Sequence, residues 1–63
     1  MSKRIRILKG MYNKIRISDS TFPILKPLET SYGKTVAIVD ASSLLGDEYK
    51  IVKVEVEDYK LLD

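Results

Sequence analysis

The chain has 63 residues, no cysteine, no histidine and a net charge of +2. A domain of this size buries only about 60% of the surface that its unfolded chain exposes, so its core must stabilise it without disulfides or the usual zinc ligands. No apolar run approaches the roughly 20 residues of a membrane span, and residues 1–10 are too charged for a secretory signal. We therefore expect one soluble, cytoplasmic domain over residues 1–63, without a cofactor or metal.

The charges are distributed unevenly along the chain. Residues 1–34 hold eight Lys and Arg against two Asp and Glu, a net charge of +6, whereas residues 35–63 hold three against seven, a net charge of −4. A basic half predicts a polyanionic partner. The alternative is that the two halves neutralise each other on the folded surface, because charged pairs across strands are common and individually weak.

Two alternating segments, residues 3–9 and 14–18, predict a β-hairpin at the start of the chain. Each alternates isoleucine with lysine or arginine, a period of two that is typical of strands, and a glycine lies in the break between them. Pairing Ile7 with Ile15 places all four isoleucines on one face and leaves residues 10–12 as a three-residue loop. We expect that face to pack into the core.

The opposite face of this hairpin is basic and is the best candidate for a functional site. Arg6 is predicted to lie opposite Arg16, and like charges directly opposed in a sheet are unfavourable for folding. Cations beside the ring of Tyr12 suit phosphates and exposed bases, although alternating Lys and Arg is also an ordinary way to keep a strand surface soluble. The candidate binding residues are Arg4, Arg6, Lys9, Tyr12, Lys14 and Arg16.

The middle of the chain is predicted to contain one long loop and one strand. Residues 19–33 have no sustained period and carry two prolines, so they indicate an irregular loop whose apolar side chains, Phe22 among them, cap one end of the core. Residues 34–40 are rich in β-branched side chains and predict a strand. Residues 41–47 predict a loop with at most one helical turn.

The last third of the chain organises the predicted fold. Its alternation slips by one residue between Ile51 and Val52, which predicts a bend or bulge, and residues 57–59 predict a tight turn before a short closing strand, 60–62. A bent strand that serves two sheets curls a small sheet into a barrel, so we expect an all-β, five-stranded small barrel. Its predicted core consists of Ile5, Ile7, Ile15, Ile17, Val36, Ile38, Ile51, Val54 and Leu61.

This pattern resembles the Src-homology-3-like small barrels. Those domains also have five strands, a long early loop and a single 3₁₀ turn before the last strand, and that turn and strand are similar to Val56-Glu57-Asp58-Tyr59-Lys60-Leu61-Leu62. The peptide-binding members carry an aromatic-rich early motif and a paired tryptophan, whereas this chain has no tryptophan. The resemblance therefore implies the fold rather than the binding of proline-rich peptides.

The first hairpin also resembles the KOW-type barrels of transcription and ribosomal proteins. The shared features are an apolar strand, a glycine and an aromatic residue in a basic turn, found here in Ile5-Arg6-Ile7-Leu8-Lys9-Gly10-Met11-Tyr12-Asn13-Lys14. The family normally has a second glycine near Asn13, but asparagine tolerates the left-handed conformation of such a turn. The resemblance implies contact with RNA or with the transcription or translation machinery.

These features favour a non-catalytic binding module over an enzyme. The chain lacks histidine and cysteine for general-base or thiol chemistry and has no phosphate-binding loop or dinucleotide fingerprint. Its acidic cluster, Glu55, Glu57 and Asp58, is interpreted as a solvated outer face rather than a metal site.

The predicted partner of the basic hairpin is nucleic acid or a nucleoprotein complex. The alternative is a small interaction or inhibitor module, of the kind that phages and mobile elements encode, whose basic face docks on an acidic patch of a larger protein. Both partners require the same charges. We expect a monomer or, through the apolar pair Leu44 and Leu45, a weak homodimer.

Overall fold

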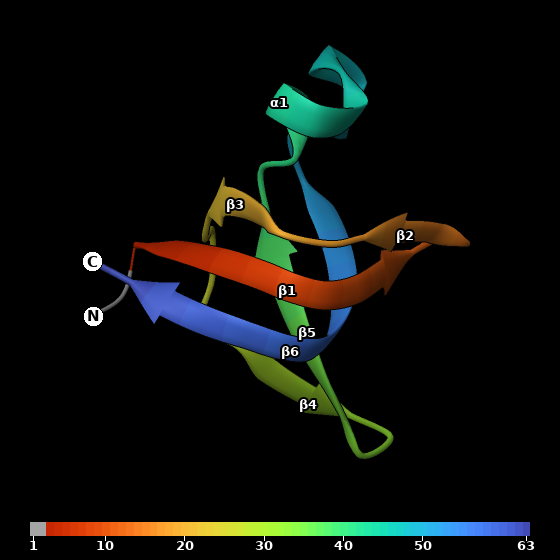
Figure 1. The fold of residues 1–63 in the computed structure, drawn as a ribbon, viewed down its shortest axis with the longest axis vertical. Helices are drawn as coiled ribbons and strands as arrows, with labels where there is room; N and C mark the ends of the chain where they lie inside the picture. The colour runs from red at the N-terminus through yellow and green to blue at the C-terminus, as the bar shows by residue number, and fades with distance from the viewer. Residues whose placement is uncertain (1–2) are drawn as a thin grey trace.

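The computed structural model describes residues 3–63, and antiparallel β-strands dominate it (Figure 1). The all-β prediction is confirmed, but residues 3–63 hold six strands rather than five. The predicted long loop contains two short strands, and the last two predicted strands form one continuous strand. A one-turn helix and a 3₁₀ turn connect the fifth strand to the sixth. The elements are β1 (Arg4–Tyr12), β2 (Ile15–Ile17), β3 (Ser20–Pro23), β4 (Glu29–Ser31), β5 (Lys34–Val39), α1 (Ser42–Leu45), η1 (Asp47–Tyr49) and β6 (Val52–Leu62).

The two longest strands, β1 and β6, lie side by side in the middle of the sheet. The strand order is β2-β1-β6-β5-β4, and β3 also pairs with β1, beside the half that β2 leaves free. The two residues that follow β3 contact β5. Ile24 forms an isolated bridge with Val39, and Leu25 N donates a hydrogen bond to Ile38 O (2.9 Å). This contact is a bridge and not a ladder, so the sheet is not closed and the predicted five-stranded barrel is not confirmed.

The predicted register of the first hairpin is wrong. Tyr12 pairs with Ile15 across a two-residue turn of Asn13 and Lys14, whose φ angles of 45° and 68° are those of a type I′ turn. Gly10 lies inside β1 and not in a loop. A Cβ atom at this position would come within 2.8 Å of the carbonyl oxygen of Glu55. The glycine thus permits β1 to approach β6 closely.

The central pair of strands changes phase part of the way along. On β1 the buried positions are Ile7 and then Gly10, three residues later, and the β1–β6 register shifts between them. On β6 the inward residues are Val56 and then Tyr59, also three residues apart. This strand runs without a break through residues 57–59, so the predicted tight turn there is wrong. The paired irregularity keeps apolar side chains on the core face while the strands curl.

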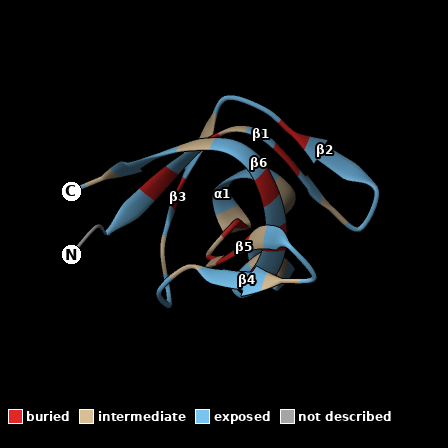
Figure 2. Cartoon of the chain, turned by 90° about the horizontal axis from the view of Figure 1, so that it is seen from below, coloured by how far each residue is buried: buried red, intermediate tan, exposed pale blue. Residues whose placement is uncertain are grey.

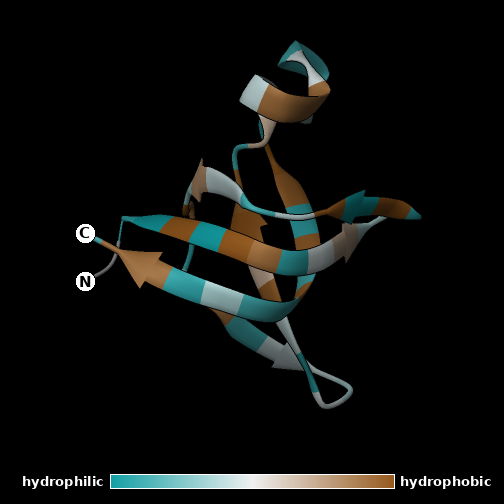
Figure 3. Cartoon of the chain, in the orientation of Figure 1, coloured by the Kyte–Doolittle hydropathy of each residue, from teal (hydrophilic) through white to brown (hydrophobic). Residues whose placement is uncertain are grey.

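The core forms where the curled sheet folds over itself, as the buried bands in Figure 2 show. Phe22 on β3 pairs with Ile5 on β1 and is among the largest buried side chains of the core. Figure 3 shows the alternation of apolar and polar residues along β1 and β6. The buried cluster consists of Ile5, Ile7, Ile17, Phe22, Ala37, Val39, Ala41, Val52, Val54 and Val56.

Several predicted core residues lie elsewhere. Ile15 and Leu61 lie near strand ends and are exposed. The chain does bend at Ile51, as predicted, but this residue precedes β6 and is 77% exposed, so it does not belong to the core. Val36 is buried, as predicted, although it is not part of the cluster, and Ile38 is half-buried. The inward residues of β5 are Ala37 and Val39 rather than the predicted Val36 and Ile38. Periodicity could not distinguish these two sets, because both faces of this strand are apolar.

The connection between β5 and β6 holds α1 and η1, which confirms the prediction of at most one helical turn at 41–47. The 3₁₀ turn before the last strand is η1, not the predicted 57–59. The carboxylate of Asp40 accepts a hydrogen bond from Ser42 N (3.0 Å), and its hydrogen bonds with Ser42 hold the pKa of Asp40 below the ordinary value of 3.8. Neither helical turn in residues 3–63 has the length and apolarity to cross a bilayer.

Candidate nucleic-acid interface

Arg4 and Arg6 project from the outer face of β1, which is the face turned away from the buried cluster. The alternation with Ile5 and Ile7 places them there, and both arginines are exposed. Arg6 lies opposite Thr21 on β3 and Lys60 on β6. The predicted opposition of Arg6 to Arg16 is therefore wrong.

Lys60 is the basic residue that the sequence did not single out. It faces Arg6 across the β1–β6 ladder, and Arg4 lies one outward position further along β1. We call Arg4, Arg6 and Lys60 the basic face. Like charges directly opposed across a ladder cost some tenths of a kcal/mol or more, so folding does not favour this arrangement. Only the register of β1 on β6 reveals it.

Asp19 partly neutralises the basic face. It lies in the connection between β2 and β3 with φ of 51°, and its Oδ1 accepts hydrogen bonds from Arg6 Nε (2.8 Å) and Nη2. The two side chains form an ion pair that remains about half exposed or more. Such pairs are worth about 0–1 kcal/mol, so Arg6 can exchange this carboxylate for another anion at little cost.

Lys9 is also paired with a carboxylate. Its Nζ lies 3.1 Å from Glu57 Oε2, and both side chains are mostly exposed. This pair joins the basic half of the chain to the acidic half. It agrees locally with the alternative that the two halves neutralise each other on the folded surface. Because the pair is exposed, Lys9 can also exchange this carboxylate for another anion at little cost.

Lys14 and Arg16 lie at the other end of β1 from the basic face. Lys14 occupies the second position of the hairpin turn, and Arg16 pairs with Met11, so its side chain lies on the outer face. Within residues 3–63 neither joins an ion pair closer than 4.0 Å. The structure brings together Arg4 and Arg6 from the predicted set and keeps Lys14 and Arg16 apart from them.

Tyr12 is the last residue of β1 and does not lie in a tip loop. It is half-buried against the core, and its ring meets Tyr49 edge-on, with centroids 6.1 Å apart and planes at 86°. An edge-to-face pair of this kind stabilises the packing of the hairpin on η1. The geometry gives Tyr12 a structural contact and leaves little of its ring for a base.

The acidic residues of β6 are dispersed and do not converge. Glu55 pairs with Lys34 (3.5 Å) and Glu57 with Lys9. In the part of the chain that the structure describes, no three carboxylates, histidines or cysteines lie close enough to hold a metal ion. These carboxylates serve as partners for surface lysines.

Comparison of the chain with known protein families, with curated proteins and with solved structures finds no significant match. The resemblance to Src-homology-3-like and KOW-type barrels thus rests on the sequence pattern alone. Function has to be inferred from the surface itself.

Proposed function

We propose that the protein is a non-catalytic binding module that contacts nucleic acid, free or within a nucleoprotein complex, through its basic face. One observation carries the proposal: Arg6 and Lys60 lie directly opposite each other on an exposed surface, next to Arg4. Their mutual repulsion opposes folding, whereas a bound phosphate would relieve it.

The chemistry of the face suits phosphate groups. An arginine guanidinium offers a planar fork of donors that pairs with two phosphate oxygens, and a lysine ammonium adds a point charge. Arg4 and Arg6 are two residues apart on one strand face, which separates them by about 6.8 Å. Both can therefore hold successive phosphates of a backbone that runs along β1, with Lys60 beside them.

We also propose that the curled sheet belongs to the small-barrel class that the sequence resembles. β6 pairs with both β5 and β1, and the bridge between Ile24 and Val39 joins the remaining sides. The basic face lies on the outer surface of this curled sheet, on β1 and β6.

The test is a salt titration of labelled single- and double-stranded RNA and DNA. The double variant Arg4→Gln/Lys60→Gln should bind more weakly, with a log–log salt slope that is less steep by about 0.7–0.9 for each phosphate that the protein no longer neutralises. Lys26→Gln/Lys50→Gln has the same net charge but lies outside the basic face, and it should bind like the wild type.

Two results would contradict the proposal. One is an equal fall in affinity in both double variants, which would indicate attraction by net charge alone. The other is an absence of binding to any of the four nucleic acids at low salt. That second result would favour the alternative of a module that docks on an acidic protein surface.

A further inference from the structure

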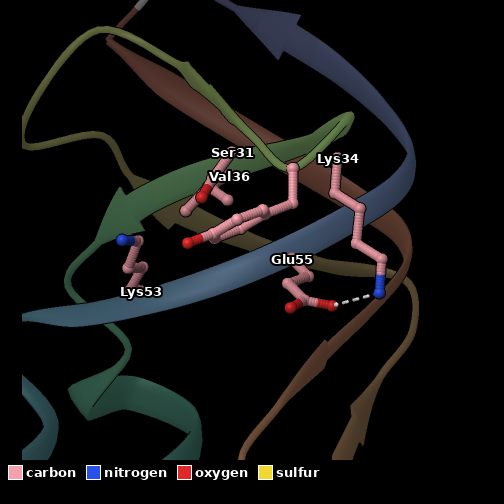
Figure 4. A pocket seen from close by; sticks show the side chains of 6 residues that line it. Ser31, Lys34, Val36, Lys53 and Glu55 are labelled. Atoms are coloured by element: carbon pink, nitrogen blue, oxygen red, sulfur yellow. Dashed lines mark ion pairs between the residues drawn. The ribbon is translucent and has the colours of Figure 1, made fainter.

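Figure 4 shows a shallow pocket of about 390 Å³ on the outer face of the sheet, and none of its lining residues belongs to the basic face. It is formed by the β4–β5 turn, the start of β5 and the first half of β6. Pockets that bind small ligands have volumes of about 300–1,000 Å³, so this one is large enough for a single nucleotide. Its lining residues are Ser31, Tyr32, Lys34, Val36, Lys53 and Glu55.

Tyr32 is the unusual residue of this pocket. It is fully exposed (101%) and occupies the first position of the two-residue turn Tyr32–Gly33, with φ of 52°. This position of a type I′ turn favours Asn, Asp or Gly, and a bulky side chain there is strained. Neither burial nor turn geometry accounts for an aromatic ring at this site, which suggests that the ring serves a ligand.

Val36 provides an apolar floor. It is only 3% exposed, yet it is not part of the buried cluster, because the cluster takes the alternate residues Ala37 and Val39 of the same strand. Val36 therefore faces outward, between Glu29 on β4 and Glu55 on β6. Only this small exposed part of Val36 is open to the pocket, so a stacked base would contact mainly the ring of Tyr32.

Two lysines at the rim of the pocket offer contacts for phosphates. Lys34 and Lys53 flank the pocket on opposite sides, with Val36 and Ser31 between them (Figure 4). Glu55 is the carboxylate among the lining residues, and Glu29 flanks Val36 on the other side. The contact of Glu55 with Lys34 at 3.5 Å joins two exposed side chains, which makes it a weak pair. Lys53 joins no ion pair within the described residues. Lys53, and Lys34 once it releases Glu55, can each pair with a phosphate.

We propose that this pocket takes one unpaired nucleobase, which stacks on Tyr32 above Val36 while its flanking phosphates lie against Lys53 and Lys34. The inference rests on the proposed function and specifies the ligand as single-stranded nucleic acid. Bases in a duplex are stacked on one another and cannot reach a ring at a turn, whereas a single strand presents them freely. Glu55 can accept a hydrogen bond from an exocyclic amino group of the base.

The experiment compares two labelled single-stranded DNA oligonucleotides of equal length, one with bases and one in which every site is abasic. Tyr32→Asn removes the ring and supplies a residue that the turn prefers, so the fold should be retained, which thermal unfolding verifies. Its affinity for the base-bearing strand should fall roughly 5- to 150-fold, with no change for the abasic strand. Tyr32→Phe keeps the stacking surface and should bind like the wild type.

The outcomes separate this inference from the proposed function. If Tyr32→Asn binds the base-bearing strand as tightly as the wild type, or loses affinity equally for both strands, the stacking site is overturned while the basic face stands. If Arg4→Gln/Lys60→Gln weakens both strands and Tyr32→Asn weakens only the base-bearing one, both stand. If the wild type binds neither strand at low salt, the stacking site is overturned, and the proposed function is then decided by the RNA and duplex ligands of the salt titration.

Discussion

Arg6 is shared between the basic face and Asp19, and this pair offers a test at the level of one residue. Asp19→Asn keeps the shape of the side chain, and asparagine tolerates the left-handed backbone at this position (φ 51°). The change frees Arg6 and should raise affinity for single-stranded nucleic acid, with a salt slope steeper by about 0.7 if one further phosphate is contacted. Stability should change by no more than about 1 kcal/mol.

The matched control for Asp19→Asn is Asp47→Asn, which removes the same charge from η1, an element that contributes nothing to the basic face. An equal rise in affinity for both variants would show that only net charge had changed. No rise with Asp19→Asn would mean that Arg6 does not contact the ligand.

Asp40 makes a prediction about acid stability. Its hydrogen bonds with Ser42 lower the pKa of Asp40 below 3.8 in the folded state, so they stabilise the fold fully above that pH and are lost as the pH falls through the lowered pKa. Wild type should therefore have the higher thermal midpoint than Asp40→Asn at pH 7, and the difference should shrink below pH 3.8. A difference that does not vary with pH would show that the charge of Asp40 is not responsible.

At the level of the elements, the hairpin turn of Asn13 and Lys14 is not optimal. Lys14 has φ of 68°, a conformation that costs an L-residue with a side chain about 1–2 kcal/mol and glycine much less. Lys14→Gly creates the preferred Asn-Gly turn and should stabilise the protein by about 1 kcal/mol, which raises the thermal midpoint by about 4–8 °C in a domain of this size.

Lys14→Gln is the control, because it removes the charge and keeps the side chain at the same φ. It should leave the midpoint close to that of the wild type. Equal midpoints for the two variants would mean that the left-handed backbone at this position is not a source of strain.

Alternation along the chain predicted most strands correctly but not their registers. Residues 3–9 and 34–40 show a clear period, and both lie in strands. Gly10 misled the prediction because a glycine between two alternating runs indicates a turn, whereas here it permits close approach to the backbone of Glu55. Residues 19–33 carry two prolines and no period, so β3 and β4 left no sequence signal.

The candidate site was also predictable only in part. The outward position of Arg4 and Arg6 follows from their alternation with isoleucine. Lys60 could not be foreseen, because it joins them only through the register of β1 on β6. Tyr32 was assigned to an irregular loop, and its exposure became meaningful only once its turn and the neighbouring Val36 were placed.

At the scale of the whole molecule, β6 brings the acidic half of the chain beside the basic half. The pairs Lys9–Glu57 and Lys34–Glu55 both join residues from different halves, and both are exposed. Opposing them is the repulsion between Arg6 and Lys60. Salt screens all three interactions, since the Debye length falls from about 30 Å at 0.01 M to about 3 Å at 1 M. The sign of the salt effect on stability therefore reports which interaction dominates.

We expect attraction to dominate, because three ion pairs, two of them between the halves, and the opposite net charges of the halves act against one repulsive contact. Raising NaCl from about 0.01 M to about 0.5 M should lower the free energy of unfolding by about 1 kcal/mol, as measured by urea titration at each salt concentration. The variant Lys9→Gln/Lys34→Gln removes both pairs and should show a smaller decrease. If salt instead stabilises the wild type, and Lys60→Gln abolishes that gain, repulsion within the basic face dominates. The free protein would then carry a larger strain for an anionic ligand to relieve.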